Sequence, residues 1–346
     1  MKGGTQYIQA LISASIANGR RCTIVSGAWE IDSAVRLPSN FTLILEDCHL
    51  RLAYGCYANV FVNEHNETEI GKTVAGTDRN ISIIGRGNAI LDGGEYNGLG
   101  EMTPPEKRPA PLYKNNLILF TNVDGFKISG LKCINQRWWA TNFIYCRNGS
   151  IENMDFCADD RRYDKDGMLV HGLIHGDEYS NIYVKNADGI DLREGCQNIV
   201  IENVTGFTED DTIALTGLAG KLEGAFRVEG LASDICNVKI RNIRAAAFCS
   251  IVRLLNQGDI KLHDIEIDGI YDTCETDTHL DKGGRAIRVG DKHMYGSRHC
   301  TKDETYNISI KNIYAAGEEA VALAGEIGNL VMYGIECAEG TVMFAE

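Results

Sequence analysis

Along most of the chain, apolar residues alternate with polar ones in a short recurring motif. The motif approximates Asn-Ile-x-Ile-x-Asn-Ile. Its copies are NFTLILE from Asn40, NISIIG from Asn80, GFKISGL from Gly125, NGSIENM from Asn148, NIYVKNA from Asn181, NIVIENV from Asn198, NVKIRNI from Asn237, DIKLHDI from Asp259, NISIKNI from Asn307 and NLVMYGI from Asn329. Apolar side chains at alternate positions give a strand one buried face, so each copy predicts a β-strand.

The intervals between the copies predict how these strands are arranged. Successive copies begin 40, 45, 23, 33, 17, 39, 22, 48 and 22 residues apart, so several intervals are about one unit of 22 and others about two. An interval of about 22 residues is too short to contain a strand, a crossover helix and a further pair of strands, so an alternating β/α fold is disfavoured. We therefore predict an all-β chain in which residues 1–346 form a single right-handed parallel β-helix domain.

Turns and one helix complete the predicted fold. The sixth motif position carries residues that tolerate a left-handed backbone, namely Gly85, Gly130, Asn153, Asn186, Asn203, Asn242, Asp264, Asn312 and Gly334. Apolar residues at helical intervals predict an α-helix over residues 5–17, with Thr5 as its N-cap and Gly19 just past its end. This helix would cap the open N-terminal end of the solenoid.

Three stretches without the motif predict loops. They are residues 97–115, which hold four of the five prolines, and residues 158–180 and 272–303. Because long loops on a rigid scaffold often surround a binding site, we expect these three to wall a cleft.

Acidic residues recur at the same period as the strands. Asp166-Gly167, Asp188-Gly189 and Asp210-Asp211 are 22 residues apart, which would stack them in neighbouring coils about 4.8 Å apart. Carboxylates this close raise the pKa of at least one member, as acid and base roles at one pH require. Aspartates are also common in turns, and clustered acids can bind calcium, so both alternatives stay open.

Composition narrows the classes of partner and compartment. The formal charge of -14, from 34 basic and 48 acidic residues, disfavours nucleic acid and anionic membranes. No apolar stretch reaches the length of a membrane span. Twelve cysteines occur without a CxxC pair, so we interpret them as small buried side chains, and with no signal peptide recognised we expect a cytoplasmic protein, or a secreted one if a leader has been removed.

At this point the sequence resembles the polygalacturonase-like glycoside hydrolases of family 28, in the pectin-lyase-type β-helix superfamily. The resemblance lies in Asn186-Ala187-Asp188-Gly189-Ile190-Asp191, Glu209-Asp210-Asp211-Thr212-Ile213-Ala214-Leu215, and Arg108-Pro109 followed by LILFTNVDGFKISGLKCINQRWW. It implies that Asp210 is the general acid and that Asp188 and Asp211 activate water, with inversion at the anomeric carbon. The separation of about 6.5–9.5 Å that such a reaction needs fits adjacent coils.

The chain also departs from the family pattern. GKLEGAFRVEG stands where the family has Gly-His-Gly, and Arg253-Leu254-Leu255 replaces its Arg-x-Lys. Of the two cations that would hold a substrate carboxylate, this motif therefore keeps only the arginine. The departures weaken the prediction of the substrate more than the prediction of the hydrolytic reaction.

Further residues are candidates for substrate binding. We assign this role to Asn186, Asp166, Arg193, Arg253, His171 and Trp139. Arg193 could bind sugar hydroxyls or a carboxylate and Trp139 could stack on a sugar ring, although a solvated turn and core packing are the competing interpretations. His171 and His175 lie four apart beside glycines that disfavour a helix, so zinc binding is the lesser alternative.

Together these features predict an inverting glycoside hydrolase acting on a pectic or related oligo- or polysaccharide. Asp188, Asp210 and Asp211 would be catalytic, and no metal or organic cofactor is implied. Two alternatives stay open: a β-helix lyase or epimerase, and a non-catalytic carbohydrate-binding solenoid. The sugar, exo or endo cleavage and the oligomeric state are not fixed by the sequence.

Overall fold

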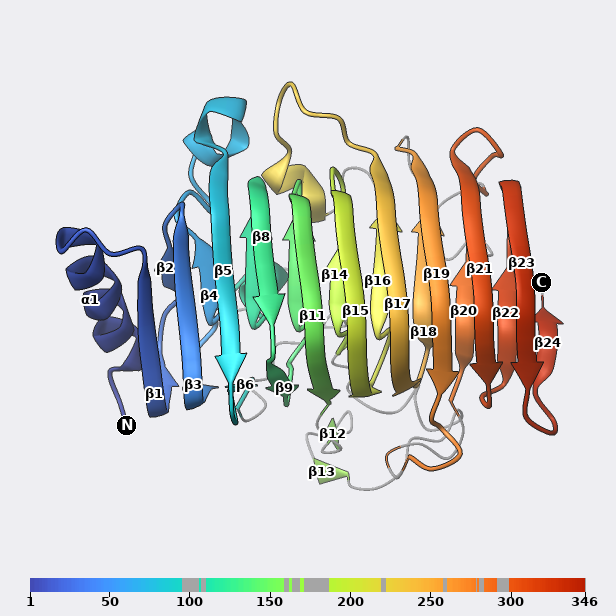
Figure 1. The fold of residues 1–346 in the computed structure, drawn as a ribbon, viewed down its shortest axis with the longest axis horizontal. Coiled ribbons are helices and arrows are strands. Elements are labelled where there is room, and N and C mark those ends of the chain that lie inside the picture. Colours follow the sequence, from blue (N-terminus) through green and yellow to red (C-terminus); the bar gives the residue numbers. More distant parts are fainter. Residues whose placement is uncertain are drawn as a thin grey trace.

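The chain coils into a right-handed parallel β-helix, as the recurring motif predicts (Figure 1). The structure is a computed structural model that describes residues 1–94, 106, 110–158, 162–163, 169–170, 187–218, 222–257, 260–277, 279, 283–290 and 299–345. Two long parallel sheets run along the solenoid, one behind the other in Figure 1, with helix α1 (Gly4–Ala17) at the N-terminal end.

The strands of each sheet come from successive coils. The twelve-stranded sheet contains β1 (Cys22–Ile31), β3 (Phe41–Leu52), β5 (Asp78–Arg86), β6 (Ile90–Asp92), β8 (Val123–Ser129), β9 (Lys132–Ile134), β11 (Arg147–Cys157), β15 (Gln197–Thr208), β17 (Ile235–Ala247), β19 (Leu262–Asp272), β21 (Thr305–Ala315) and β23 (Gly328–Cys337). The ten-stranded sheet contains β2 (Val35–Leu37), β4 (Phe61–Asn63), β7 (Ile118–Thr121), β10 (Thr141–Ile144), β14 (Ile190–Leu192), β16 (Ile213–Gly217), β18 (Ser250–Asn256), β20 (Arg285–Val289), β22 (Glu319–Leu323) and β24 (Val342–Ala345).

Short elements lie outside the two long sheets. They are the antiparallel pair β12 (Arg162–Tyr163) and β13 (Leu169–Val170), and the 3₁₀ turns η1 (Ile70–Lys72), η2 (Val74–Gly76), η4 (Leu112–Lys114) and η6 (Leu222–Phe226). No helix within the described residues is long and apolar enough to cross a membrane.

Apolar side chains from equivalent strand positions stack into columns inside the solenoid. One column runs through Leu43, Ile83, Ile128, Ile151, Ile201, Ile240, Ile267 and Ile310, all fully buried. Each buried isoleucine contributes about 1.5–3 kcal/mol relative to an exposed one. Because equivalent residues of successive coils pack on one another, the motif that forms each strand also specifies its register with the strand of the next coil.

Asparagine ladders mark both ends of the motif, although a left-handed backbone was expected only at the sixth position. Asn198 and Asn203 both have φ 57°. The Asn198 amide donates to Asn148 Oδ1 at 3.1 Å, and the Asn203 amide donates to Asn153 Oδ1 at 3.1 Å. Asparagine supplies both the rare backbone conformation and a coil-to-coil hydrogen bond, which explains why the motif begins and ends with it.

Most predicted turn residues adopt the expected backbone. Positive φ is found at Gly130, Asn153, Asn203, Asn242, Asp264, Asn312 and Gly334. The prediction is wrong for Gly85, which has no positive φ; a Cβ there would lie 2.0 Å from the carbonyl oxygen of Gly130, so close backbone approach requires this glycine. Asn186 lies outside the described residues.

Strand pairing corrects the position of two motif copies. Cys236 and Val238 pair with His263 and Ile265, so the coil after Asn237 begins its motif at Asp264 and reads DIEIDGI. The expected copy at Asp259 is out of register, because apolar residues alternate at 260 and 262 and again, in the other phase, at 265 and 267, and the sequence pattern alone does not say which phase pairs with the neighbouring coil.

The second correction concerns the expected copy at Asn181. Strand β11 pairs directly with β15, and the amide of Asn198 bonds Asn148, 50 residues earlier. These 50 residues form one coil of the large sheet and not two, and residues 171–186 lie outside the described part of the chain.

Helix α1 covers the first coil, as expected, but its N-cap differs from the prediction. Ile8 and Ile12 are buried against the solenoid core. Gly3, with φ 80°, is the N-cap in place of Thr5. The Thr5 hydroxyl instead donates to the Ser33 carbonyl at 2.8 Å, so it ties the helix to the coil that it covers.

Candidate active site

The outer face of the ten-stranded sheet carries two rows of side chains that run across the coils. The leading row, just before the strands, contains Asn116, Trp139, Asp188, Asp211 and Ser250. The central row contains Val62, Leu119, Asn142, Asp191, Ala214, Arg253 and Arg288. Ile190 and Leu192 point into the core, so alternation along the strand leaves Asp191 and its row facing outward, while the leading row lies where the chain enters the strands.

Asp188 and Asp211 are neighbours in the leading row. The amide of Gly189 donates to the Asp211 carbonyl at 3.0 Å, and Ile190 pairs with Ile213. The offset between the two coils is 23 residues, so the neighbour of Asp188 in the row is Asp211, whereas the expected 22-residue spacing would have aligned it with Asp210. Asp210 precedes Asp211 directly, and the two motifs therefore bring three carboxylates together.

The row does not continue as a third carboxylate layer on the N-terminal side. The coil before Asp188 contributes Trp139 at the position where the 22-residue spacing predicted Asp166. The spacing failed because the coil from Asn148 to Asn198 is 50 residues long. Asp166 itself lies outside the described residues, as do His171 and Asn186.

The carboxylates influence one another strongly. Asp188 is 4% exposed, and its Oδ1 has no hydrogen-bond partner among the described residues. Burial, reinforced by nearby Asp191, Asp210 and Asp211, raises the pKa of Asp188 well above its ordinary value. The positive charge of Arg193 acts in the opposite direction. The cluster therefore retains a proton at a pH where isolated aspartates are ionised.

Asp211 is perturbed in the same direction. Burial raises its pKa, while the guanidinium of Arg253 opposes this rise. The residue is partly exposed, but its Oδ1 is buried without a hydrogen-bond partner in the described chain. An arrangement that holds both a proton and negative charge in adjacent coils can carry out acid–base chemistry.

Cations lie on the C-terminal side of the carboxylates. Strand pairing sets Arg253 beside Arg288 in the central row, and both guanidinium groups act electrostatically on Asp211. Leu255, where the family has a lysine, is 4% exposed and apolar. The sequence pattern missed Arg288 because it lies one coil further on, 35 residues from Arg253, where only the strand register reveals it.

Trp139 and Arg193 lie on the N-terminal side. Trp139 stacks on Trp138 with ring centroids 3.8 Å apart, and the Arg193 guanidinium lies 4.1 Å from the Trp139 ring centroid. Arg193 also approaches Asp191 at 3.6 Å. Trp139 is thus already engaged in two stacking contacts and is 6% exposed, so a sugar ring could stack on it only by displacing one of them.

Among the described residues, no group of three or more His, Cys, Asp or Glu side chains is arranged to hold a metal ion. Asp191, fully buried beside Arg193, was quoted in the sequence motif without a role, and its contribution to the pKa of Asp188 now gives it one.

The fold and the carboxylate rows define a right-handed parallel β-helix with an acidic cluster on one outer face. The family model of glycosyl hydrolases family 28 matches residues 58–230, half of the chain. The chain belongs to glycosyl hydrolases family 28. The match includes Asp188, Asp210 and Asp211 and ends before Arg253 and Arg288.

Solved structures share this fold at low identity. The endo-xylogalacturonan hydrolase from Aspergillus tubingensis has a TM-score of 0.56 and 13% identity, over 99% of this chain and 94% of that one. The tailspike protein of Escherichia coli bacteriophage HK620, solved with a pentasaccharide, has a TM-score of 0.53 and 15% identity, over 98% of this chain and 60% of the tailspike. A sequence comparison with curated proteins gives no match.

Proposed function

We propose that the protein hydrolyses a glycosidic bond in a pectic or related oligosaccharide, with inversion at the anomeric carbon. The observation that carries this proposal is the stacking of Asp188 on Asp211 in adjacent coils, next to Asp210, in a cluster that retains a proton. Hydrolysis by inversion needs one carboxylic acid and at least one carboxylate on opposite sides of the scissile bond.

The three aspartates divide this work. Asp210 donates a proton to the glycosidic oxygen, and Asp188 with Asp211 activates the water that attacks from the other face. Burial of Asp188 and the charge of its neighbours keep a proton in the cluster. In this division of roles the proton resides on Asp210 when substrate is bound, so that Asp188 is ionised and can accept a proton from water. Once the acid has given up its proton and a base has gained one, the cluster exchanges protons with solvent to begin the next cycle.

The substrate bears a carboxylate on the C-terminal side of the bond. Arg253 and Arg288 stand together there, and guanidinium groups bind carboxylates through paired, charge-assisted hydrogen bonds. The second cation, which the family motif lacks at Leu255, is thus supplied by the next coil. Together with membership of family 28, this cation pair favours an acidic, uronate-containing substrate over a neutral one.

A panel of pectic and neutral oligosaccharides tests the proposal with Asp210→Asn as the key variant. We expect turnover of an acidic substrate by the wild type and a loss of at least a hundredfold in kcat for the variant, because positioned acid catalysis contributes about 10²–10⁴-fold. Tyr333→Ala, an exposed change on the last coil, is the control and should leave the rate unchanged.

Three outcomes would contradict the proposal. Unchanged hydrolysis by Asp210→Asn would remove the acid assignment. An unsaturated product that absorbs in the ultraviolet would identify a lyase. Binding of the panel without turnover, unaffected by the substitution, would identify a non-catalytic carbohydrate-binding solenoid.

A further inference from the structure

The outer face of the ten-stranded sheet is covered over β4 and β7. Val62 on β4 and Leu119 on β7 belong to the central row, yet both are buried under Phe226 and Val228. These two side chains come from a segment that follows β16, several coils further along the chain. The central row is therefore covered at Leu119, which lies two strands before Asp191 on the N-terminal side.

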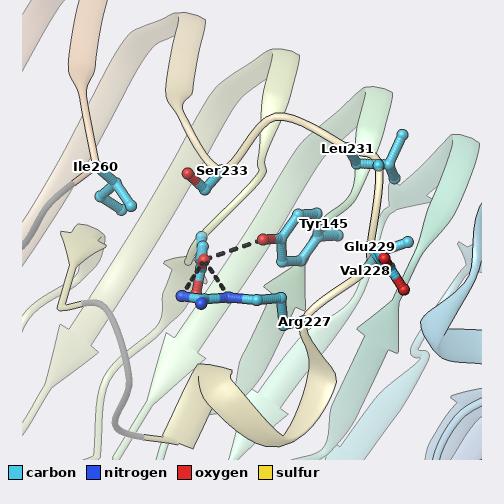
Figure 2. Close-up of a pocket in the computed structure, with 9 residues that line it drawn as sticks. Tyr145, Arg227, Val228, Glu229, Leu231, Ser233 and Ile260 are labelled. Carbon is cyan, nitrogen blue, oxygen red and sulfur yellow. Dashed lines mark hydrogen bonds and ion pairs between the residues drawn. The ribbon is translucent and has the colours of Figure 1, made fainter.

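The covering segment is held firmly against the sheet. Arg227 donates to Glu194 Oε1 from Nε and Nη2 at 3.2 and 3.0 Å, and the hydroxyl of Tyr145 donates to the same oxygen at 2.9 Å (Figure 2). Glu194 is 1% exposed, so this contact is buried on the carboxylate side. Further along, the amide of Glu229 donates to the Lys72 carbonyl at 3.3 Å, so the segment reaches back to the coil that contains η1.

A second segment closes the remaining gap. Tyr113, in η4, meets the Phe226 ring edge-on with centroids 5.0 Å apart. The adjacent Leu112 packs on Trp138 and Trp139. The side chains of Tyr113, Phe226 and Val228 thus form one apolar wall, defined by these three residues, across β4 and β7, while Leu112 belongs to the separate cluster with the two tryptophans.

Only the coil of β10 separates this wall from the carboxylates. Coils are about 4.8 Å apart, a spacing comparable with the length of one pyranose ring. Asn142 occupies the central row in this coil, 1% exposed, with its Oδ1 lacking a hydrogen-bond partner among the described residues. A buried amide oxygen of this kind is costly unless a hydroxyl donates to it, and a terminal sugar supplies hydroxyl groups.

We propose that the protein removes a single sugar residue from one end of its substrate, because the apolar wall leaves room for one residue on the N-terminal side of the carboxylates. This inference rests on the proposed hydrolase function and adds its mode of cleavage. Asn142 receives a hydroxyl of the terminal residue, while the rest of the substrate extends toward Arg253 and Arg288 on the C-terminal side.

The test uses oligogalacturonides and rhamnogalacturonan oligosaccharides of defined length, labelled at the reducing end, and follows the products of the wild type from the first time point. We expect monosaccharide alone, with the labelled chain shortening one residue at a time or the label itself being released. A mixture of internal fragments at the first time point would overturn the inference and leave the hydrolase function standing. Absence of any hydrolysis at any pH would overturn both.

A wall variant tests the structural cause. Phe226→Ala together with Tyr113→Ala should open the N-terminal side, so that fragments longer than a monosaccharide appear, while Tyr333→Ala serves as the matched exposed aromatic truncation and keeps the wild-type products. Thermal melting of each variant establishes that it is folded. Release of monosaccharide alone by a folded double variant would show that these side chains do not set the cleavage mode.

Discussion

Replacing Asp188 by asparagine should stabilise the fold while it abolishes activity. Asp188 lies one coil, about 4.8 Å, from Asp211, and two like charges at this distance repel by about 3 kcal/mol at an effective dielectric constant of 20. Asparagine keeps an oxygen at the buried Oδ1 position, so the expected gain comes from the removed charge and not from hydrogen bonding. Because the native protein avoids part of the repulsion by keeping a proton, we expect a net gain of about 1–3 kcal/mol for Asp188→Asn.

The gain should depend on pH in a defined direction. The pKa of Asp188 is raised in the folded state, so the unfolded chain loses its proton first, at about pH 3.9. The wild type loses stability from this pH upward until the folded carboxyl also ionises. Below about pH 4 both states of the wild type carry a neutral group, and the variant should gain least there.

Thermal melting from pH 4 to pH 8 measures this difference. For 346 residues, about 1–3 kcal/mol corresponds to a rise in Tm of roughly 1.5–4 °C at pH 8 that shrinks toward pH 4. Asp303→Asn, the same substitution at an exposed position outside the cluster, controls for a general charge effect. A variant that is less stable than the wild type at pH 8, or a difference independent of pH, would refute the proposed strain in the cluster.

Two other substitutions test the fold and the substrate. Asn203→Ala should lower the free energy of unfolding by about 2–4 kcal/mol, because alanine disfavours the left-handed backbone and loses two ladder hydrogen bonds. Asn203→Gly, which tolerates this backbone, should cost about half as much in a denaturant titration. Equal costs would argue against backbone strain. Arg288→Leu should lower kcat/KM for acidic oligosaccharides about 10–100-fold and leave neutral ones unchanged, and an equal loss on both would argue against a role in binding a carboxylate.

The fold was largely predictable, because alternation and motif recurrence are local signals. Each motif copy is short, and its alternating apolar residues alone indicate a strand with one buried face. Equivalent residues of successive copies, such as Ile201 and Ile240, then pair with each other, and this pairing builds the solenoid. The register was predicted less well. The apolar pattern around Asp264 fits two registers, and only pairing with the neighbouring strand distinguishes them. The 50 residues before Asn198 contain an additional match to the motif, which led to a wrong coil length, because strands do not encode the length of the loop that joins them.

The candidate site was predicted in part for the same reason. Asp188, Asp210 and Asp211 lie within one motif pair and were found together, although the partner of Asp188 in the row is Asp211. Arg288 was missed because only pairing between β18 and β20 sets it beside Arg253.

The apolar wall was missed because it joins segments distant in sequence. Tyr113 and Phe226 are 113 residues apart, and neither carries a motif that points to the other. The predicted loops at 97–115 and 272–303 are only partly described, and the roles expected for Asp166, His171 and Asn186 stay predictions.

The anomeric configuration of the first product tests the central claim most directly. Proton NMR of a fresh digest, recorded before mutarotation, distinguishes the two anomers released from an oligosaccharide of known linkage. If Asp188, Asp210 and Asp211 act as acid and water-activating bases, the product has the configuration opposite to that of the bond cleaved. A product that keeps the original configuration would contradict this account.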